Sequence, residues 1–211
     1  MTFLELHQFM KEDSLLYYRI KKLFPLKWQQ LEKEKYILNN SKQVILVKQG
    51  LLVQEKKRKN TTSYCRMFTN QQIIFSINGM TVLRALEDTV YSVISTDMLF
   101  DELEEQKLLS NLFLQLQEDL EKDWEQEQIL QWFPTSDRVD FLLQLIIKRY
   151  QLTPVTNTEF PFWLKIETLA RFVDCSAIMV SRRVKELANK GLINAKSEPW
   201  RLLQTLPEAI T

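Results

Sequence analysis

The chain has 211 residues, of which 45% are hydrophobic and 26% are charged, so it can bury a core and is not a disordered polymer. Its 28 Lys and Arg are balanced by 27 Asp and Glu, which excludes a uniformly basic DNA-coating protein. Two cysteines, one histidine and three glycines exclude a disulfide framework, a multi-histidine metal site and the common glycine-rich phosphate loops.

The N-terminal sequence and the distribution of apolar residues predict a soluble protein. The first seven residues, ending at His7, lack the basic and apolar segments of a secretory signal. No apolar run approaches the ~18 residues that a membrane-spanning helix needs. We therefore expect a cytoplasmic protein with reduced thiols.

The first part of the chain is predicted to form one short helix followed by closely spaced strands. Apolar residues three and four apart between Leu15 and Phe24, ahead of Pro25, are typical of an amphipathic helix. Short strand-like runs follow at residues 44–47, 51–53, 61–68, 71–77 and 89–94. Such a series predicts a small antiparallel barrel or sandwich.

Two segments between the predicted strands have the composition of turns. Asn78-Gly79 stands between two apolar runs and predicts a β-hairpin. The basic run from Lys56 to Lys59 has two interpretations, a nucleic-acid contact or a solvated hairpin tip. We favour the hairpin tip, because charge runs between strands are usually solvated.

Residues 97–131 predict a single long helix. The segment from Asp97 to Glu127 contains eleven acidic residues and two lysines, without Gly or Pro. Apolar residues three or four apart form a stripe along it, with Phe113 beside the stripe: Leu109, Leu112, Leu116, Leu120 and Trp124. A helix of about 30 residues is roughly 45 Å long, more than a small domain needs for its own core. We predict that residues 103–133 pair with a second copy of the chain; the alternative is that the stripe packs on its own barrel.

A domain boundary is predicted at Phe133-Pro134, because proline ends the long helix. Residues 134–211 hold eleven Lys and Arg against eight Asp and Glu, a net charge of +3, whereas residues 1–133 hold 17 against 19, a net charge of −2. Thr135-Ser136 is a candidate N-cap for an apolar-periodic helix that ends near Tyr150. The proline-containing residues 151–161 are predicted to form a loop or a short ribbon.

The last segment predicts two short helices joined by a tight turn. Residues 163–173 and 177–187 are the helices, and Asp174-Cys-Ser176 is the turn, with Ser176 as the N-cap of the second helix. The second helix places three apolar side chains on one face: Val180, Val184 and Leu187. Residues 189–193 stop this helix and begin a strand. This order is typical of a winged helix-turn-helix.

The polar face of the second helix suits double-stranded DNA. Ser181, Arg182 and Lys185 lie away from the apolar face. Arg182 can donate two hydrogen bonds to a guanine edge in the major groove; the alternative is an exposed charge on a surface helix. Lys165, Lys185 and Lys196 are candidates for phosphate contacts around it.

A family resemblance is carried mainly by residues 164–193. The matching residues are Leu169-Ala170, Val173, Cys175-Ser176, Val180-Ser181-Arg182, Lys185, Leu187 and Gly191-Leu-Ile193. With Ser136-Asp-Arg-Val139 upstream, they resemble the CRP/FNR superfamily of bacterial transcription regulators, relatives of the cyclic-AMP receptor protein. Residues 44–53 around Gly50 resemble a barrel hairpin of the family's sensor domain. Leu83 to Tyr91 resembles the strand after its phosphate-binding cassette.

The resemblance implies an α+β fold in three parts. Residues 1–102 would form a sensor-like β-barrel of the cyclic-nucleotide-binding, cupin-type jelly-roll kind. Residues 103–133 would form the dimerisation helix, and residues 134–211 a winged helix-turn-helix DNA-binding domain. The expected DNA contacts are Ser136, Lys165, Ser176, Ala177, Ile178, Ser181, Arg182, Lys185 and Lys196.

The same resemblance implies a homodimeric transcription regulator that binds a pseudo-palindromic operator and works with RNA polymerase. We expect no enzymatic activity, no cofactor, and neither catalytic nor metal-binding residues. One alternative is an effector-gated sensor, with DNA binding controlled by an unidentified small molecule or by oxidation of Cys65 or Cys175. Another is a cupin-like enzyme, which would need histidines that the predicted strands lack.

The sequence departs from the family pattern at the residues that bind the cyclic nucleotide. Family members that bind cyclic nucleotides hold the phosphate with a Gly-Glu pair and an Arg-Ser pair. Ile74 to Val82 stands in that place without an Arg-Ser pair, and Arg84 lies beyond the position of the phosphate arginine. We therefore predict that cyclic AMP is not used. The lack of cysteines before Cys65 and the single histidine speak against the oxygen- and haem-sensing members.

The recognition helix departs from the family as well. Many members place Arg and Glu directly after the capping serine, whereas Ala177 and Ile178 follow Ser176 here. This difference implies another operator, with an apolar contact to a thymine methyl group. The recognition helix is closer to that of the Gram-positive branch of the family, which includes the listerial virulence activator.

Overall fold

The computed structural model describes residues 15–57, 62–76 and 79–207. His7, Asn78 and two members of the basic run, Arg58 and Lys59, lie outside these residues. The chain divides into two compact units: residues up to 56 with 65–125, and residues 57–64 with those from 126 onward. This division falls within a helix, ahead of the predicted boundary at Phe133-Pro134.

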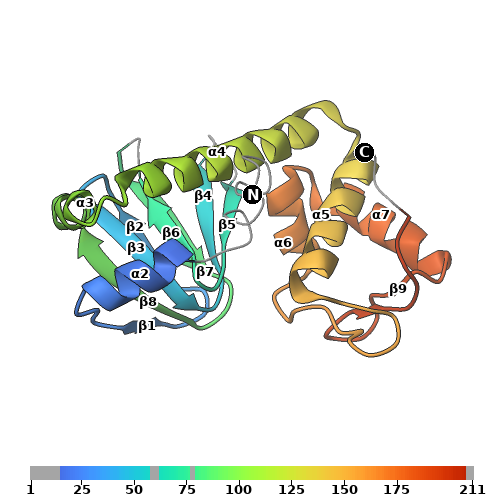
Figure 1. Ribbon diagram of the computed structural model, residues 1–211. Coiled ribbons are helices and arrows are strands. Elements are labelled where there is room, and N and C mark those ends of the chain that lie inside the picture. Colours follow the sequence, from blue (N-terminus) through green and yellow to red (C-terminus); the bar gives the residue numbers. More distant parts are fainter. Residues whose placement is uncertain (1–14, 58–61, 77–78, 208–211) are drawn as a thin grey trace, which may run out of the picture. The chain divides into compact units, whose positions relative to one another are not determined.

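The described part of the first unit contains strands β1 to β8 and helices at both of its ends (Figure 1). The helices are α2 (Leu15–Leu23), α3 (Thr96–Glu105) and α4 (Leu109–Trp132), of which α4 continues into the second unit. The strands are β1 (Gln29–Leu31), β2 (Tyr36–Asn39), β3 (Gln43–Gln49), β4 (Leu52–Lys57), β5 (Thr62–Phe68), β6 (Ile73–Phe75), β7 (Thr81–Ala85) and β8 (Thr89–Ser95). The predicted N-terminal helix and the five strand-like runs are confirmed, whereas β1, β2 and β7 were not among these runs. The single strand that the resemblance implied from Leu83 to Tyr91 is wrong, because this segment is the end of β7, a turn and the start of β8.

The strands form two antiparallel sheets with the orders β1-β8-β3-β6 and β2-β7-β4-β5. Strand β3 is buried on both of its faces. Ile45 and Val47 face the core between the sheets, while Val44 and Leu46 face the core beneath the helices. Successive side chains of a strand point to opposite faces, so a strand buried on both faces is apolar throughout.

Two predicted hairpins are wrong, because the chain changes sheet at both turns. Strands β3 and β4 flank Gly50 but lie in different sheets, and so do β6 and β7, which flank the Asn78-Gly79 signal. Gly50 has a φ of 105°, and a Cβ atom there would lie 2.5 Å from Oγ1 of Thr89. Only glycine fits where this connection passes so close to the start of β8.

We expect Gly50→Ala to destabilise the first unit by about 2–4 kcal/mol, because a strained φ and a backbone clash add together. Gly79→Ala is the matched control. Gly79 also has a positive φ of 74°, but no described atom lies within 4 Å of its would-be Cβ, so its cost is about 1 kcal/mol. Urea unfolding curves of both variants measure the difference; equal midpoints would contradict the close approach at Gly50.

The predicted single helix over residues 97–131 is wrong, since α3 and α4 are separate. Leu103 of α3 and Leu112 of α4 are both buried in the same core beneath the sheet. At about 100° per residue, these two side chains would point to opposite sides of one continuous helix. The chain therefore breaks at Lys107, which has a φ of 58°, and both leucines reach the core.

The second unit contains three helices and a short antiparallel strand pair among its described residues from 126 on. They are α5 (Thr135–Tyr150), α6 (Ile166–Val173), α7 (Ala177–Asn189), β9 (Ile193–Asn194) and β10 (Arg201–Leu202). Helix α6 begins three residues later than predicted, because Lys165 has extended backbone angles at its N-cap. The N-cap of α5 is Pro134, so the predicted cap at Thr135-Ser136 is wrong: both residues already lie in the first turn.

Candidate nucleic-acid interface

Helix α7 has the N-terminus and the buried face that its sequence predicts. Ser176 caps it, with its Oγ accepting a hydrogen bond of 3.4 Å from the Met179 backbone N–H. Val180, Val184 and Leu187 are buried against the rest of the unit. These contacts fix the rotation of α7 about its axis, and therefore determine which side chains face solvent.

The face of α7 opposite the core carries Ile178, Arg182 and Lys185. The three lie four and three residues apart, so they form one line along the helix. Arg182 exposes 85% of its side chain, Ile178 is 82% exposed, and Lys185 is exposed too. Arg182 contacts Glu186 through an exposed ion pair of 3.6 Å, which is weak enough to be exchanged for another partner.

A groove of about 710 Å³ runs beside this face, between α6, α7 and the strand pair. Four predicted contact residues line it: Lys165, Ser181, Lys185 and Lys196. Lys165 also meets Glu198 at 3.6 Å, through an exposed pair. Asn189 and Asn194 line the groove as well. Neither was predicted as a contact, because isolated asparagines near a helix end are typical of turns.

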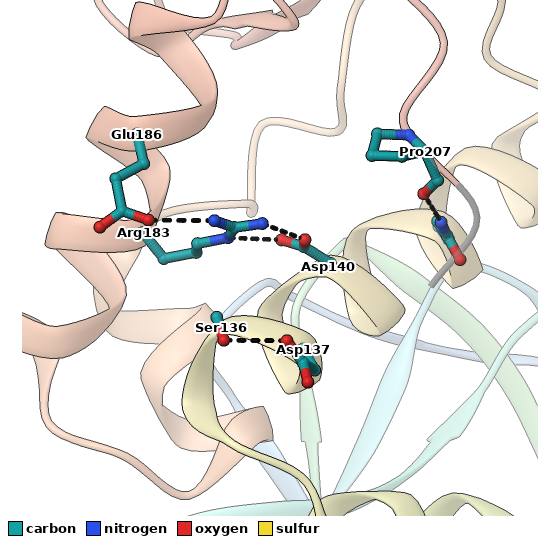
Figure 2. A network of polar contacts seen from close by, with 7 residues as sticks. Ser136, Asp137, Asp140, Arg183, Glu186 and Pro207 are labelled. Carbon is teal, nitrogen blue, oxygen red and sulfur yellow. Dashed lines mark hydrogen bonds and ion pairs between the residues drawn. The ribbon is translucent and has the colours of Figure 1, made fainter. Parts of the chain in front are cut away.

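Ser176 and Ala177 are exposed at the start of α7, near Ile178, but Ser136 does not join this group. Its Oγ donates to Oδ1 of Asp137 at 2.9 Å in the first turn of α5 (Figure 2). Ser136 is also half-buried and is not among the residues that line the groove. The structure therefore brings together eight of the nine predicted DNA contacts.

Arg183, next to Arg182 in sequence, connects α7 to α5 through its side chain. Its guanidinium donates to both carboxylate oxygens of Asp140 on α5 and to Oε2 of Glu186 at 3.0 Å (Figure 2). Only 17% of its side chain is exposed. The hydrogen bond to Asp140 raises the pKa of the Arg183 guanidinium above its usual range. Arg183 therefore fixes α7 on α5, and its charge is neutralised locally.

Cys175 lies in the turn between α6 and α7. Its Sγ is 3.3 Å from Oγ1 of Thr135 and 3.3 Å from the carbonyl oxygen of Val173. It is half-buried, as expected for a small side chain that fills a turn. Cys65 is exposed on β5, with its Sγ 3.4 Å from the carbonyl oxygen of Gln54.

The predicted dimerisation residues on α4 separate into two groups. Leu112 is buried in the core of its own unit, and Leu109 and Leu116 pack against that core. Phe113, Leu120 and Trp124 are exposed. The expectation that all six residues face a partner is therefore wrong for Leu112, because α4 uses that side to cover the sheet.

Phe113, Leu120 and Trp124 line an apolar groove of about 620 Å³ in the first unit. Leu116, Phe75 of β6 and Phe100 of α3 complete its apolar lining. The rim includes polar residues such as Gln117 and Glu121. Apolar side chains gathered on an exposed surface are one mark of a protein–protein contact.

Another face of α4 is fixed to the sheet by Arg66 on β5. Its Nε lies 2.6 Å from Oδ2 of Asp123, and both side chains are about three-quarters buried. Burial raises the pKa of the neighbouring Asp119, an effect that Lys122 and Arg66 partly offset. These contacts hold α4 so that Leu120 and Trp124 remain outward.

Arg84 on β7 is already engaged within the sheet. Its Nε donates to Oε1 of Glu55, and its other guanidinium nitrogen donates to the carbonyl oxygen of Glu34 at 2.8 Å. The Glu55 side chain is only 5% exposed. Arg84 therefore forms a cross-strand ion pair with Glu55.

No helix among the described residues combines the length and the apolar character needed to cross a membrane. No three His, Cys, Asp or Glu side chains of these segments are grouped as metal ligands would be.

The chain is similar to several solved structures. No family model and no curated protein sequence matches the chain. FixK2 from Bradyrhizobium japonicum is similar at a TM-score of 0.73 and 14% identity, covering 89% of this chain and 100% of its own. The c-di-GMP-responsive global regulator CLP from Xanthomonas campestris has a TM-score of 0.72 and 17% identity, with coverages of 92% and 100%. A CRP/FNR-family transcriptional regulator from Thermus thermophilus has a TM-score of 0.65 and 15% identity, with coverages of 84% and 94%.

The chain has the fold of these solved structures, one of which is described as a member of the CRP/FNR family. This confirms the resemblance found in the sequence and the coarse fold class, α+β with antiparallel sheets and several helices. The coverage includes most of the first unit, where the sequence resemblance was loose. Two of these three neighbours are described as regulators.

Proposed function

We propose that the chain is a sequence-specific DNA-binding transcription regulator that acts as a homodimer on a pseudo-palindromic operator. The observation that carries this proposal is the outward face of α7, where Arg182 and Lys185 stand free of the core beside a lysine-lined groove. A helix fixed on one side and polar on the other is what major-groove recognition needs.

In this proposal, α5, α6, α7 and the β9–β10 pair form a winged helix-turn-helix. Helix α7 enters the major groove, and Arg182 recognises a base edge. Lys165, Lys185 and Lys196 contact the phosphate backbone. The eight strands of the first unit act as a jelly-roll barrel that supports the dimer. Ala177 and Ile178 after the capping serine support a relation to the Gram-positive branch of the family.

The homodimer is proposed to form through the groove beside α4. Phe113, Leu120 and Trp124 would meet the same residues of a second copy, as in any two-fold interface. A partner helix is the occupant that fits an apolar stripe of this length. Two α7 helices would then contact half-sites about one DNA turn apart, roughly 34 Å. The protein would act in the cytoplasm, with RNA polymerase as its partner.

Selection from a pool of random DNA duplexes tests the function. The full-length protein should enrich one sequence with two related half-sites, and affinity for it should exceed that for a scrambled duplex by at least about a thousandfold. Selection is carried out with and without a cell extract. Enrichment that requires the extract would favour the effector-gated alternative, and no enrichment in either arm would contradict DNA recognition.

We predict that cyclic AMP and cyclic GMP do not bind. The residues that stand in the phosphate-binding segment lack an Arg-Ser pair, and Arg84 is paired with Glu55. Burying a phosphate without a paired cation is costly. Calorimetric titration should therefore detect no binding of either nucleotide at millimolar concentration, and a micromolar dissociation constant with one site per chain would overturn the prediction.

A further inference from the structure

Ile178 is the most exposed large apolar side chain of the proposed recognition helix. It is 82% exposed, although isoleucine is among the residues most often buried. It lies on the same line of α7 as Arg182, one turn closer to the N-terminus. The core face of α7 points the other way, so packing within the unit does not account for an isoleucine here.

The neighbours of Ile178 on α7 do not share its position. Met179 lies about 100° around the helix, is 52% exposed, and gives its backbone N–H to the Ser176 cap. Ala177 presents a single methyl group. Ile178 is thus the one large apolar side chain of α7 that is aligned with the exposed cations.

We propose that Ile178 recognises the 5-methyl group of a pyrimidine in each operator half-site, and so binds thymine and 5-methylcytosine alike. This inference rests on the proposed DNA-binding function. In the major groove, the thymine methyl is the apolar group that a base edge presents. The cations Arg182 and Lys185 on the same line favour a polyanion as the occupant of this face, which makes DNA a better partner than an apolar protein surface.

The methyl contact has a predictable size. Removing one buried methyl group lowers affinity about fourfold. Since a two-fold dimer uses Ile178 once per half-site, removing both methyl groups should weaken binding about fifteenfold. Arg182 would contribute base recognition one turn further along the same groove.

The test replaces thymine by deoxyuridine, which differs only in that methyl group. Each thymine of the selected operator is exchanged in turn, symmetrically in both half-sites, and affinities are measured for the full-length protein. One symmetric pair of positions should show the loss of about fifteenfold. A second comparison at this position uses cytosine against 5-methylcytosine, each paired with guanine, and the methylated base should bind tighter by the same factor.

Three variants assign the contact to its residue. Ile178→Ala should bind thymine and deoxyuridine operators equally, and Ile178→Val should keep part of the difference. Met179→Ala is the matched control and should retain the full sensitivity to the methyl group. If Ile178→Ala keeps the full sensitivity, or if no thymine position responds in the parent, the proposal is overturned.

The two failures can be told apart. If no operator is enriched from the random pool, the proposed function fails and this inference fails with it. If an operator is enriched and Arg182→Ala loses its preference for it, while deoxyuridine has no effect at any position, only the role of Ile178 is wrong.

Discussion

Replacing Arg182 by alanine is expected to abolish the preference for the selected operator over a scrambled duplex. A bidentate contact between arginine and guanine typically contributes about 1–3 kcal/mol of discrimination, and a two-fold dimer makes it twice. Arg182 is suited to this contact, because it is 85% exposed and only an exposed 3.6 Å pair with Glu186 must be given up on binding.

Lys185→Ala and Lys196→Ala are the matched controls for Arg182→Ala. A lysine on the phosphate backbone carries no sequence information, so both variants should weaken operator and scrambled duplex alike. Each lost phosphate contact should also lower the slope of log affinity against log salt by about one. Titrations of all three variants at two salt concentrations measure both effects. An unchanged specificity ratio for Arg182→Ala would show that another residue, Ser181 or Ile178, makes the principal base contact.

Leu120→Glu is expected to convert the proposed homodimer to monomers at micromolar concentration. In the proposed two-fold interface, the two glutamates would be buried without a counter-ion. A cost of about 3 kcal/mol corresponds to roughly a hundredfold in the dissociation constant. Leu120 is 47% exposed in one copy, so the substitution should not disturb the core of the unit.

Leu114→Glu is the matched control for dimerisation. Leu114 is 43% exposed on the same helix, but it does not line the groove that contains Leu120. Sedimentation equilibrium should find this variant dimeric and Leu120→Glu monomeric. A parent protein that is already monomeric, or a Leu120→Glu variant that stays dimeric, would contradict pairing through this groove.

Helix α7 could be predicted closely because local rules determine it. A capping serine, apolar residues at Val180, Val184 and Leu187, and a stop near Gly191 require only neighbouring residues. Even there, the role of Arg183 escaped prediction. Its partner Asp140 lies 43 residues away, and no spacing rule links an arginine on one helix to a carboxylate on another.

The first unit was predicted less accurately because its pairings are long-range. The Asn78-Gly79 signal describes a local turn, but it does not determine whether the two flanking strands pair with each other. They lie in different sheets. Similarly, an apolar period along residues 97–131 is compatible with one helix or two. The burial of both Leu103 and Leu112 in one core decides between them.

The strand order of the first unit has a consequence for how the protein is made. Strand β8 (Thr89–Ser95) pairs with both β1 and β3, yet it leaves the ribosome after the seven other strands of the first unit. Until it emerges, β3 presents an unpaired edge, and the sheet β1-β8-β3-β6 is incomplete. Such intermediates are prone to aggregation and are substrates for chaperones. The three-helix arrangement of the second unit depends on closer neighbours and is expected to fold rapidly once synthesised.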